Sequence, residues 1–320
     1  MITPEGSRSG GNGDPTGEVS APATAMPQPE HGRGPGMQPL PSRGTARRST
    51  DPLAAVDPDS WHGPVIGVLG GLGPAATAIF LDLLVRATAA SSDQEHLDVL
   101  VSQHSSTPDR TAGILHDDAP DPGPVLARDA HMLERMGSDV LVLPCNTAHH
   151  FVQGVLDATT VPFVSIVEAT MDTVEQVIAT TGGSVGVFAT EGTIAARVYQ
   201  DAIEHRGLTP LVPDPALQAE INALIYEQVK AGRPIDRGMV ARTIAQAKAA
   251  GAGVIVLGCT ELSVIYDRLG MRGEAGLVDS LTELARATVL AAGRELSPDF
   301  QSAPRAAAEA TAGDEGSLPE

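Results

Sequence analysis

The sequence has few aromatic residues and only two cysteines. Aromatic side chains make up 3% of its 320 residues, against 42% for hydrophobic residues as a whole. A core with so few rings must be built from Ala, Val, Leu and Ile, which suits parallel strands alternating with helices better than a β-sandwich. Two cysteines are too few for a disulfide scaffold. The composition therefore favours an α/β fold in a reducing compartment.

Long apolar runs and basic residues are also scarce. No stretch is apolar for long enough to cross a membrane, and the start of the sequence lacks a secretory hydrophobic region, so we expect a cytoplasmic protein. Lys and Arg number 21 against 40 Asp and Glu, which gives a formal net charge of -19. Nucleic acids and anionic membranes need basic patches, so we expect neither as a partner. A small anionic substrate is still compatible, because a site needs only one or two local cations.

Both ends of the sequence differ from its middle. Residues 1–60 are rich in Gly, Pro, Ser and Thr without apolar periodicity, and residues 298–320 have the same character, so both are predicted to be disordered tails. The predicted strands between them are Val65–Leu69, Leu97–Ser102, Val140–Leu143, Pro162–Ile166, Val185–Phe188, Leu208–Val212, Val254–Leu257 and Gly276–Val278. The predicted helices are Ala75–Ala89, Val125–Met136, Ala148–Ala158, Glu168–Ile178, Thr193–His205, Ala216–Val229, Asp236–Ala249 and Leu281–Ala291. This alternation implies right-handed crossovers and parallel sheets.

Two parts of the middle region resemble each other. The strand and small-residue turn of Ile66–Gly71 are matched by Val185–Thr190, and an apolar run that ends in a cysteine follows each at a similar interval. We interpret the repeat as two pseudo-symmetric lobes, each a mostly parallel sheet flanked by helices, with the active site in the cleft between them. The predicted first lobe comprises residues 61–167 and 279–297, and the second comprises residues 168–278.

The two cysteines, Cys145 and Cys259, follow the apolar runs Leu141–Leu143 and Val254–Leu257. Ligands of open α/β sheets bind at the carboxyl ends of strands, where helix-start amides bias a thiol toward the thiolate. From a reference pKa of about 8.5, only a modest decrease would let two thiols share one proton at neutral pH. Two facing thiols of this kind could remove a proton from one side of a carbon and deliver one to the other.

Other interpretations of the cysteines are open. A single cysteine is more often a small buried hydrophobe, and only the repeat favours the catalytic interpretation. A disulfide is disfavoured in the cytoplasm. A zinc site is disfavoured because there is no C-x-x-C motif and because the adjacent His149 and His150 point in different directions on a helix. We expect this histidine pair on a helix surface, with support of Cys145 by one of them as the alternative.

Two further features could bind a substrate carboxylate, and a third is ordinary at this point. Gly70–Ala76 contains G-x-G-x-x-A, a weak dinucleotide fingerprint, but the next strand ends without the acidic residue that would hold a ribose. Backbone amides around Gly71 could instead hold a carboxylate. Arg110, in the turn Thr107–Thr111, is either a solvated loop residue or a clamp for a carboxylate. Lys230 ends a helix, where a lysine is ordinary.

The motifs of the middle region match one family when they are taken together. They are Gly67–Pro74, Asp93–His96, Pro108–Thr111, Pro144–His149, Tyr226–Gly232 and Leu257–Leu262. Over roughly residues 65–291 the chain resembles the aspartate/glutamate racemase family, and most closely its aspartate racemase branch. The glutamate racemase branch usually has Asp-Ser in the first loop and His after the second Cys-Thr, where this chain has Gly70-Gly71 and Glu261.

The resemblance implies a two-lobed α/β fold and a racemase that uses no cofactor and no metal. It implies that Cys145 and Cys259 are the catalytic acid/base pair. The expected substrate contacts are Gly71, Arg110, Asn146, Thr147, Ala148, Lys230 and Thr260. The expected reaction is interconversion of L- and D-aspartate, with glutamate or another amino acid as alternative substrates, and we expect a homodimer.

Substrate identity is more open than reaction type. Glu191 and the loop Gln103–Ser106 depart from the family pattern. A related cofactor-free enzyme, such as a maleate isomerase or a hydantoin racemase, is one alternative, and a small-molecule binding module without turnover is another. The presence of both cysteines with Asn146 argues against the binding module, since binding alone needs no thiol pair.

Overall fold

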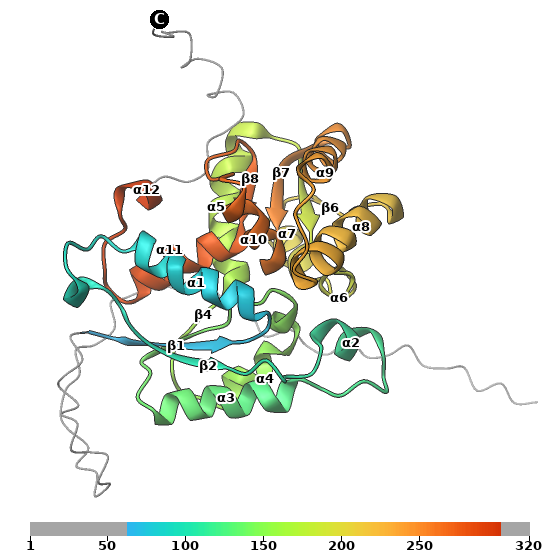
Figure 1. Ribbon diagram of the computed structural model, residues 1–320. Coiled ribbons are helices and arrows are strands. Elements are labelled where there is room, and N and C mark those ends of the chain that lie inside the picture. Colours follow the sequence, from blue (N-terminus) through green and yellow to red (C-terminus); the bar gives the residue numbers. More distant parts are fainter. Residues whose placement is uncertain (1–62, 302–320) are drawn as a thin grey trace, which may run out of the picture. The chain divides into compact units, whose positions relative to one another are not determined.

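The computed structural model describes residues 63–301, and its strands form two four-stranded parallel sheets (Figure 1). The first sheet has the order β2-β1-β3-β4, with β1 at Val65–Gly70, β2 at Asp98–Gln103, β3 at Val140–Val142 and β4 at Phe163–Val164. The second has the order β6-β5-β7-β8, with β5 at Ser184–Phe188, β6 at Pro210–Leu211, β7 at Ala252–Leu257 and β8 at Leu277–Asp279. Both sheets place their strands in the same relative order. The predicted α/β class is confirmed.

Each predicted strand overlaps an observed one. Continuous apolar runs predict strands that are buried on both faces, and all six residues of β1 are indeed buried. The predictions for β4 and β6 are too long, since each of these edge strands has only two residues. Short edge strands leave few unpaired backbone groups exposed.

Helices flank both sheets. In chain order they are α1 (Pro74–Ala87), α2 (Arg110–Leu115), α3 (Gly123–Arg135), α4 (Val152–Asp157), α5 (Ile166–Thr181), α6 (Glu191–Ala195), α7 (Val198–His205), α8 (Pro215–Asn222), α9 (Arg237–Ala249), α10 (Thr260–Arg268), α11 (Ser280–Ala291) and α12 (Pro298–Gln301). Short 3-10 helices lie at Asp93–Glu95 (η3) and Thr147–Phe151 (η4), and a π-helix, η5, spans Ala223–Lys230.

One hydrophobic core lies between the two sheets. Strands of both sheets and the helices α1, α5, α7 and α11 contribute to it, with buried side chains that include Val68, Phe80, Met171, Val187 and Leu284. The outer face of the first sheet is covered by α3 and α4, and the outer face of the second by α8, η5, α9 and α10 (Figure 1). Because the sheets share a core, loops from both can line one pocket.

The exact lobe boundaries stay a prediction. Helices α5 and α11 pack against each other, α5 also contacts β5, β7 and β8, and α11 also contacts β3, β4 and β8. These two helices therefore belong to the joint between the sheets as much as to either sheet.

The predicted tails lie outside the described residues, apart from residues 298–301. These four residues form α12, in which Phe300 is buried at 3% exposure, and the guanidinium of Arg272 lies 3.7 Å from the centroid of the Phe300 ring. The start predicted for the C-terminal tail is therefore too early. Phe300 packs into the core, whereas Pro298, Asp299 and Gln301 are exposed, so one aromatic side chain holds this short segment against the rest of the structure.

Two predictions about local structure were wrong. The segment Thr193–His205, predicted as one helix, forms α6 and α7, and Arg197 separates them with a left-handed φ of 55°. The segment Thr107–Thr111, predicted as a turn, leads into α2. Here the Asp109 carboxylate caps the helix by accepting a hydrogen bond from the amide of Ala112.

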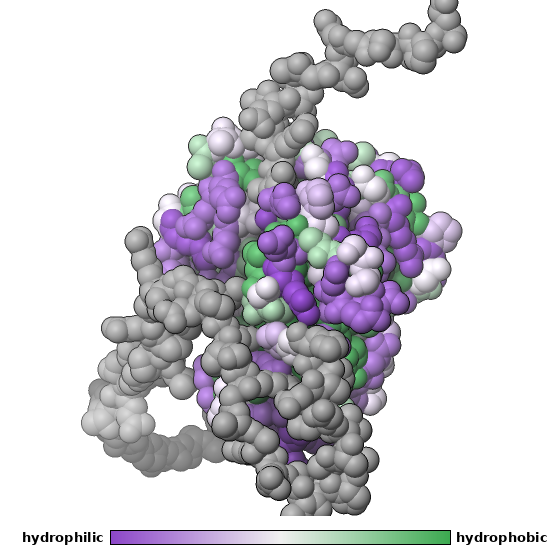
Figure 2. Space-filling view, turned by 90° about the vertical axis from the view of Figure 1, so that its left-hand side faces the viewer, coloured by the Kyte–Doolittle hydropathy of each residue, from purple (hydrophilic) through white to green (hydrophobic). Residues whose placement is uncertain are grey.

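The visible surface of the described residues is mostly hydrophilic. Figure 2 shows hydrophobic residues in smaller patches among polar and charged ones. Single exposed apolar side chains such as Val85 and Met136 are ordinary on a protein surface. No described helix is both long and apolar enough to cross a membrane.

Candidate active site

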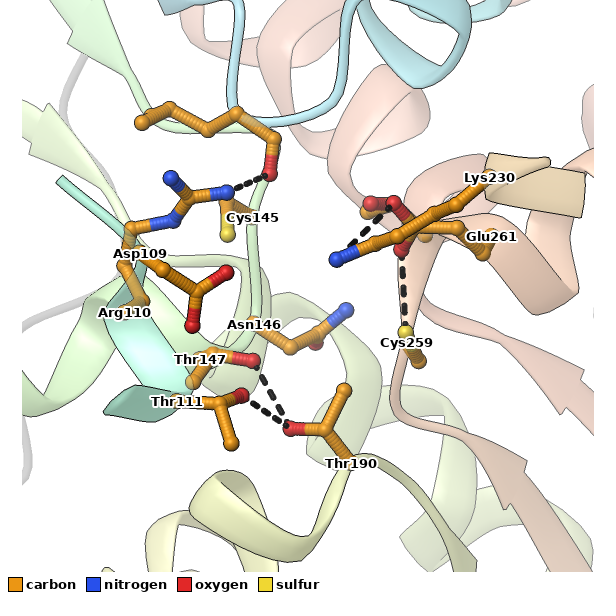
Figure 3. Close-up of a pocket in the computed structure, with 12 residues that line it drawn as sticks. Asp109, Arg110, Thr111, Cys145, Asn146, Thr147, Thr190, Lys230, Cys259 and Glu261 are labelled. Carbon is orange, nitrogen blue, oxygen red and sulfur yellow. Dashed lines mark hydrogen bonds and ion pairs between the residues drawn. The ribbon is translucent and has the colours of Figure 1, made fainter. Parts of the chain in front are cut away.

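A small pocket lies where strands of both sheets end. Its walls come from the loops after β1, β3 and β5, the start of α2, the end of η5 and the start of α10. The lining residues are Leu72, Asp109, Arg110, Thr111, Cys145, Asn146, Thr147, Thr190, Lys230, Cys259, Thr260 and Glu261 (Figure 3). This is the edge at which open α/β sheets bind ligands.

The pocket is nearly filled by its own side chains. Its space is about 290 Å³ when the opening to solvent is included, but only about 10 Å³ can take the centre of a water molecule. That is about the space that one water needs. A larger ligand therefore reaches the cysteines only if part of the lining moves.

The pocket brings together most of the residues predicted from the sequence. Gly71 and Ala148 are the exceptions, since neither lines it. Gly71 adopts a φ of 90°, and its amide donates to Thr77 Oγ1 at 2.9 Å, so this amide is already used. A Cβ at Gly71 would lie 2.6 Å from the backbone nitrogen of His104, which explains the glycine by close backbone approach. The lining residues not predicted as contacts are Leu72, Asp109, Thr111, Thr190 and Glu261.

Cys145 lies in the loop after β3, a central strand of the first sheet, and its side chain is buried at 5% exposure. Burial raises the pKa of its thiol, and the nearby positive charge of Arg110 is the largest opposing influence. A hydrogen bond from the backbone amide of Ala148 also favours the thiolate. Ala148, although absent from the lining, therefore acts on the sulfur through its amide.

Cys259 occupies the N-cap position of α10, at 3% exposure. Its Sγ donates to Glu261 Oε2 at 3.1 Å. Burial raises the pKa of this thiol well above its usual value, and both the negative charge of Glu261 and the hydrogen bond add to the increase. The positive charge of Lys230 and the backbone amide of Glu261 act in the opposite direction.

The expectation that helix-start amides bias both thiols toward the thiolate is therefore corrected. The amides are present and do lower the pKa of Cys145 and Cys259, but burial outweighs them and both pKa values lie above the usual one. In the closed pocket both cysteines rest as thiols at neutral pH. Formation of a thiolate must be coupled to a change in the pocket or to a nearby proton acceptor.

Lys230 and Glu261 form an ion pair in the wall next to Cys259. The distance from Lys230 Nζ to Glu261 Oε1 is 3.9 Å, and Nζ lies 4.6 Å from the centroid of the Tyr226 ring. Glu261 is only 6% exposed. A Cβ at Gly73 would lie 2.9 Å from Glu261 Oε1, so the glycine leaves room for the carboxylate. Lys230 is the last residue of the π-helix η5, and Glu261 lies in the first turn of α10.

The guanidinium of Arg110 is held by backbone carbonyls. It donates to Leu72 O at 2.8 Å, to Pro108 O at 3.0 Å and to Thr107 O at 3.3 Å. Its Nε is buried and has no hydrogen-bond partner among the described residues. These contacts rule out the solvated-loop interpretation, because the side chain is fixed at the pocket and its Nε donor is unused.

Asn146 ties the first cysteine loop to the second half of the chain. Its Oδ1 accepts from the hydroxyl of Tyr199 at 2.5 Å, and its Nδ2 donates to Ser280 Oγ at 3.0 Å. Ser280 Oγ in turn donates to Leu257 O at 2.8 Å, at the end of β7. Much of the hydrogen-bonding capacity of Asn146 is therefore spent on holding the two cysteine loops in register.

Threonine hydroxyls form a second bridge across the pocket. Thr147 Oγ1 lies 3.1 Å from Thr190 Oγ1 and 2.8 Å from Thr193 Oγ1. Thr111, at the start of α2, donates to Thr190 at 3.4 Å. A Cβ at Gly192 would lie 2.8 Å from the Cα of Thr111, so α2 sits directly against the start of α6. This contact closes the pocket on one side.

The two adjacent histidines have different surroundings. His150 is exposed, as expected, but His149 is buried. Its Nδ1 lies 2.9 Å from Cys145 O, and its Nε2 accepts from the amide of Ile166 at 3.3 Å. This network assigns the proton to Nδ1 of a neutral ring. Burial lowers the pKa of His149 to about 4. His149 therefore supports the backbone of Cys145, which was the alternative expected from the sequence.

No group of three or more His, Cys, Asp or Glu side chains within residues 63–301 could hold a metal ion. The polar groups of the pocket are instead two thiols, two cations, two carboxylates and several hydroxyls. Such a set can bind a small molecule that carries both charges and can exchange protons with it.

Comparisons with known proteins agree on one family. The sequence model described as Asp/Glu/Hydantoin racemase matches residues 69–288. A broad-specificity amino-acid racemase of Bacillus subtilis is 28% identical over 229 residues, covering 70% of this chain and 96% of the relative. A glutamate racemase of Herpetosiphon aurantiacus is 33% identical over 184 residues, covering 53% of this chain and 67% of the relative.

Solved structures share the fold. An aspartate racemase of Picrophilus torridus superimposes with a TM-score of 0.63 at 24% identity, covering 75% of this chain and 98% of that one. An aspartate racemase homologue from Pyrococcus horikoshii gives a TM-score of 0.56 at 23% identity, covering 72% and 99%. At these identities the likeness concerns the fold alone.

Proposed function

The chain belongs to the Asp/Glu/Hydantoin racemase family, a family of isomerases, and on this basis we propose that it interconverts the L and D enantiomers of a small amino acid, with aspartate favoured. We further propose that it does so by proton transfer between Cys145, Cys259 and the α-carbon, without pyridoxal phosphate. The observation that carries the proposal is that both cysteines line one buried pocket.

The charges of the pocket complement an acidic amino acid. The α-carboxylate would lie among the hydroxyls of Thr147 and Thr260, and the side-chain carboxylate would lie near Arg110 Nε and Lys230. The carboxylate of Asp109 would accept from the α-ammonium group. Charged hydrogen bonds in a site without water are stronger than neutral ones, and they fix the α-carbon between the two sulfurs.

The proposed reaction is one proton exchange on each side of the α-carbon. One cysteine, as thiolate, takes the α-proton, so that an S–H bond forms as the C–H bond breaks. The other, as thiol, gives its proton to the opposite side, and the reverse reaction exchanges the two roles. An α-proton is a very weak acid, so donors and cations in the closed pocket must stabilise the developing negative charge.

The direct test is chiral chromatography of a panel of L-amino acids after incubation with the purified protein. We expect D-aspartate to appear, with deuterium at the α-carbon when the reaction is run in heavy water. The double variant Cys145→Ala/Cys259→Ala, purified in the same way, controls for contaminating racemases. Turnover of maleate or of a hydantoin, with none of any amino acid, would move the chain to the isomerase or hydantoin racemase alternative.

The same assay tests cofactor independence. We expect full activity after dialysis against a chelator and no absorbance from pyridoxal phosphate, since the proposed chemistry uses only side chains of the chain itself. Loss of activity on chelation, with recovery on addition of a divalent metal ion, would contradict the two-thiol scheme.

The homodimer stays a prediction, which light scattering on the purified protein would check. The cytoplasmic location also stays a prediction.

A further inference from the structure

Glu261 is a buried carboxylate that no part of the proposed mechanism has yet used. It lies two residues after Cys259, at 6% exposure, and contacts the Cys259 sulfur through Oε2 and Lys230 Nζ through Oε1. The absent side chain of Gly73 leaves the space that the carboxylate fills. A buried carboxylate is costly to keep unless it has partners, and here the partners are one cation and one proton donor.

The other cysteine has no such partner. The residue two positions after Cys145 is Thr147, whose hydroxyl bonds to Thr190 and Thr193. The other carboxylate of the pocket wall belongs to Asp109, which caps α2. Among the described residues, no carboxylate hydrogen-bonds to Cys145. The structure therefore provides a proton acceptor for one thiol only.

On the basis of the proposed function, we propose that Glu261 is the proton partner of Cys259. It accepts the thiol proton when Cys259 acts as the base and returns it when Cys259 acts as the acid. In the first step the S–H bond of Cys259 breaks and an O–H bond forms on Glu261 Oε2. In the second step the thiolate takes the α-proton of the substrate, so that an S–H bond forms and the C–H bond breaks.

This transfer solves a problem set by burial. A thiolate made by release of a proton to water needs an open path, whereas the closed pocket has room for about one water. Transfer to Glu261 moves the proton within an existing 3.1 Å hydrogen bond and leaves the total charge of the pair unchanged. Lys230 stays next to the pair, so no uncompensated charge is created in the wall.

The proton on Glu261 also enters the return of the site to its resting state. When a turnover that starts from the Cys259 thiolate ends, Cys259 carries the α-proton, Cys145 has lost its proton, and Glu261 still holds the proton taken from Cys259. The resting state returns when Glu261 loses this proton and Cys145 gains one, by exchange with solvent as the product leaves. The charged or titratable side chains that face Cys259 and Glu261 from neighbouring elements are Asp109, Arg110, Cys145, Tyr199, Tyr226 and Lys230.

The test is the substitution Glu261→Gln, measured by titration of each cysteine and by kinetics. The chain has only two cysteines, so cysteine labelled with carbon-13 at Cβ gives two resonances, and each reports the ionisation of its own thiol. Glutamine keeps the shape of Glu261 but carries no charge and cannot take the proton. We expect the Cys259 midpoint to fall by on the order of one pH unit or more and the Cys145 midpoint to move less.

Glu261→Gln should make the Cys259 thiolate easier to form and yet make the enzyme slower. Although the Cys259 thiolate becomes easier to form, we expect kcat of Glu261→Gln to fall by about 100-fold or more, with a smaller change in KM, because the proton acceptor is gone. Activity should recover partly at high pH, where hydroxide replaces the carboxylate. Glu261→Asp keeps a carboxylate on a shorter chain, and we expect an intermediate kcat and a Cys259 midpoint closer to that of the unmodified protein.

The matched control is Glu175→Gln. Glu175 is exposed on α5 and its Oε1 lies 3.7 Å from Arg206 Nε, outside the pocket, so its loss should change neither midpoint and should change kcat by less than about twofold. Unchanged kcat in Glu261→Gln would overturn the proposal. Reduced kcat with unmoved cysteine midpoints would also overturn it, since Glu261 would then only bind substrate. If the midpoint shifts but the unmodified protein racemises no amino acid, the Glu261–Cys259 pairing holds and the racemase function fails.

Discussion

The two cysteine sites have the same backbone position but different charges around them. Each sulfur follows a central strand of a sheet with the same strand order, and each receives a backbone amide from the helix or turn that follows. Next to Cys145 the main charged neighbour is Arg110, whereas next to Cys259 it is Glu261, with Lys230 behind it (Figure 3). The fold therefore repeats the geometry, and the side chains of the surrounding loops set the difference between the two thiols.

The strongest test of this comparison is removal of each sulfur in turn. We expect Cys145→Ala and Cys259→Ala each to lower racemisation by at least about a thousand-fold, because each thiol is the group assigned to exchange a proton directly with the α-carbon on its side. Chiral chromatography measures the loss, and far-UV circular dichroism checks that the fold is kept. Substantial turnover in either variant would remove that cysteine from the mechanism. Cys→Ser should be nearly as damaging, because a hydroxyl is a far weaker acid.

The second test compares the two cations. We expect Arg110→Ala to lower activity on aspartate about 10- to 100-fold, corresponding to ~1.5–3 kcal/mol for a charged hydrogen bond, and activity on alanine much less. Lys230→Ala should lower both activities, since it removes the partner of Glu261 beside Cys259. It should lower the activity on aspartate more, since Lys230 is also placed near the side-chain carboxylate. Arg128→Ala, at an exposed position on α3, is the control. If Arg110→Ala reduces both activities equally, Arg110 binds the α-carboxylate common to both substrates.

A third test uses the histidine that only the first site has. His149 supports the Cys145 carbonyl, whereas the residue four positions after Cys259 is Ser263. The pKa of His149 is near 6.5 in the unfolded chain, and burial lowers it to about 4 in the folded protein. Its stabilisation is therefore present above pH 6.5 and is lost as pH falls toward 4. We expect ~2 kcal/mol less stability from this group at pH 5 than at pH 7.

Urea unfolding at several pH values measures this slope, and His149→Asn serves as the reference for all other titrating groups. The difference between the two proteins isolates the histidine. An identical pH slope in both would show that His149 is protonated in the folded state and would change the tautomer assigned above.

The smallest effect concerns the residues that precede the sulfurs. A Cβ at Gly258 would lie 2.7 Å from the ring of Tyr199, the residue that holds Asn146. We expect Gly258→Ala to cost ~1–3 kcal/mol of unfolding free energy through overpacking. Pro144→Ala, at the matching position of the first site, should cost less than ~1 kcal/mol, mainly through the unfolded chain. Urea denaturation gives both values, and equal costs would contradict the asymmetry in packing.

Sequence patterns were sufficient to predict where the strands lie and that most of the candidate residues meet in one pocket. Apolar runs and the repeated Cys-containing motif predict which segments are strands and which loops meet, because parallel strands end at a common edge. A helix that ends at Lys230 was predicted, but its π geometry was not, and the helix after Asp109 was not predicted at all. Both features depend on local hydrogen bonds that periodicity does not report.

The partners of individual side chains were harder to predict. Asn146 bonds to Tyr199 and Ser280, which lie far away along the chain. The raised pKa values of the thiols have a similar origin, because they follow from closure of the pocket by segments of both halves. The motif placed Cys259 at a helix start and thereby predicted the effect of the amides, but the motif carries no measure of burial. Glu261 was visible in the sequence only as a difference between two branches of the family.

The reaction equilibrium limits what the unequal charge around the two sulfurs can do to the kinetics. The two enantiomers of an amino acid have the same free energy in water, so kcat/KM must be the same from either side for any catalyst that interconverts them. An acidic partner for Cys259 alone therefore cannot make the protein accumulate one enantiomer. It can only change kcat and KM together for one direction. The asymmetry of the site would then decide which enantiomer saturates the enzyme at the lower concentration, and a full progress curve from each pure enantiomer would reveal it.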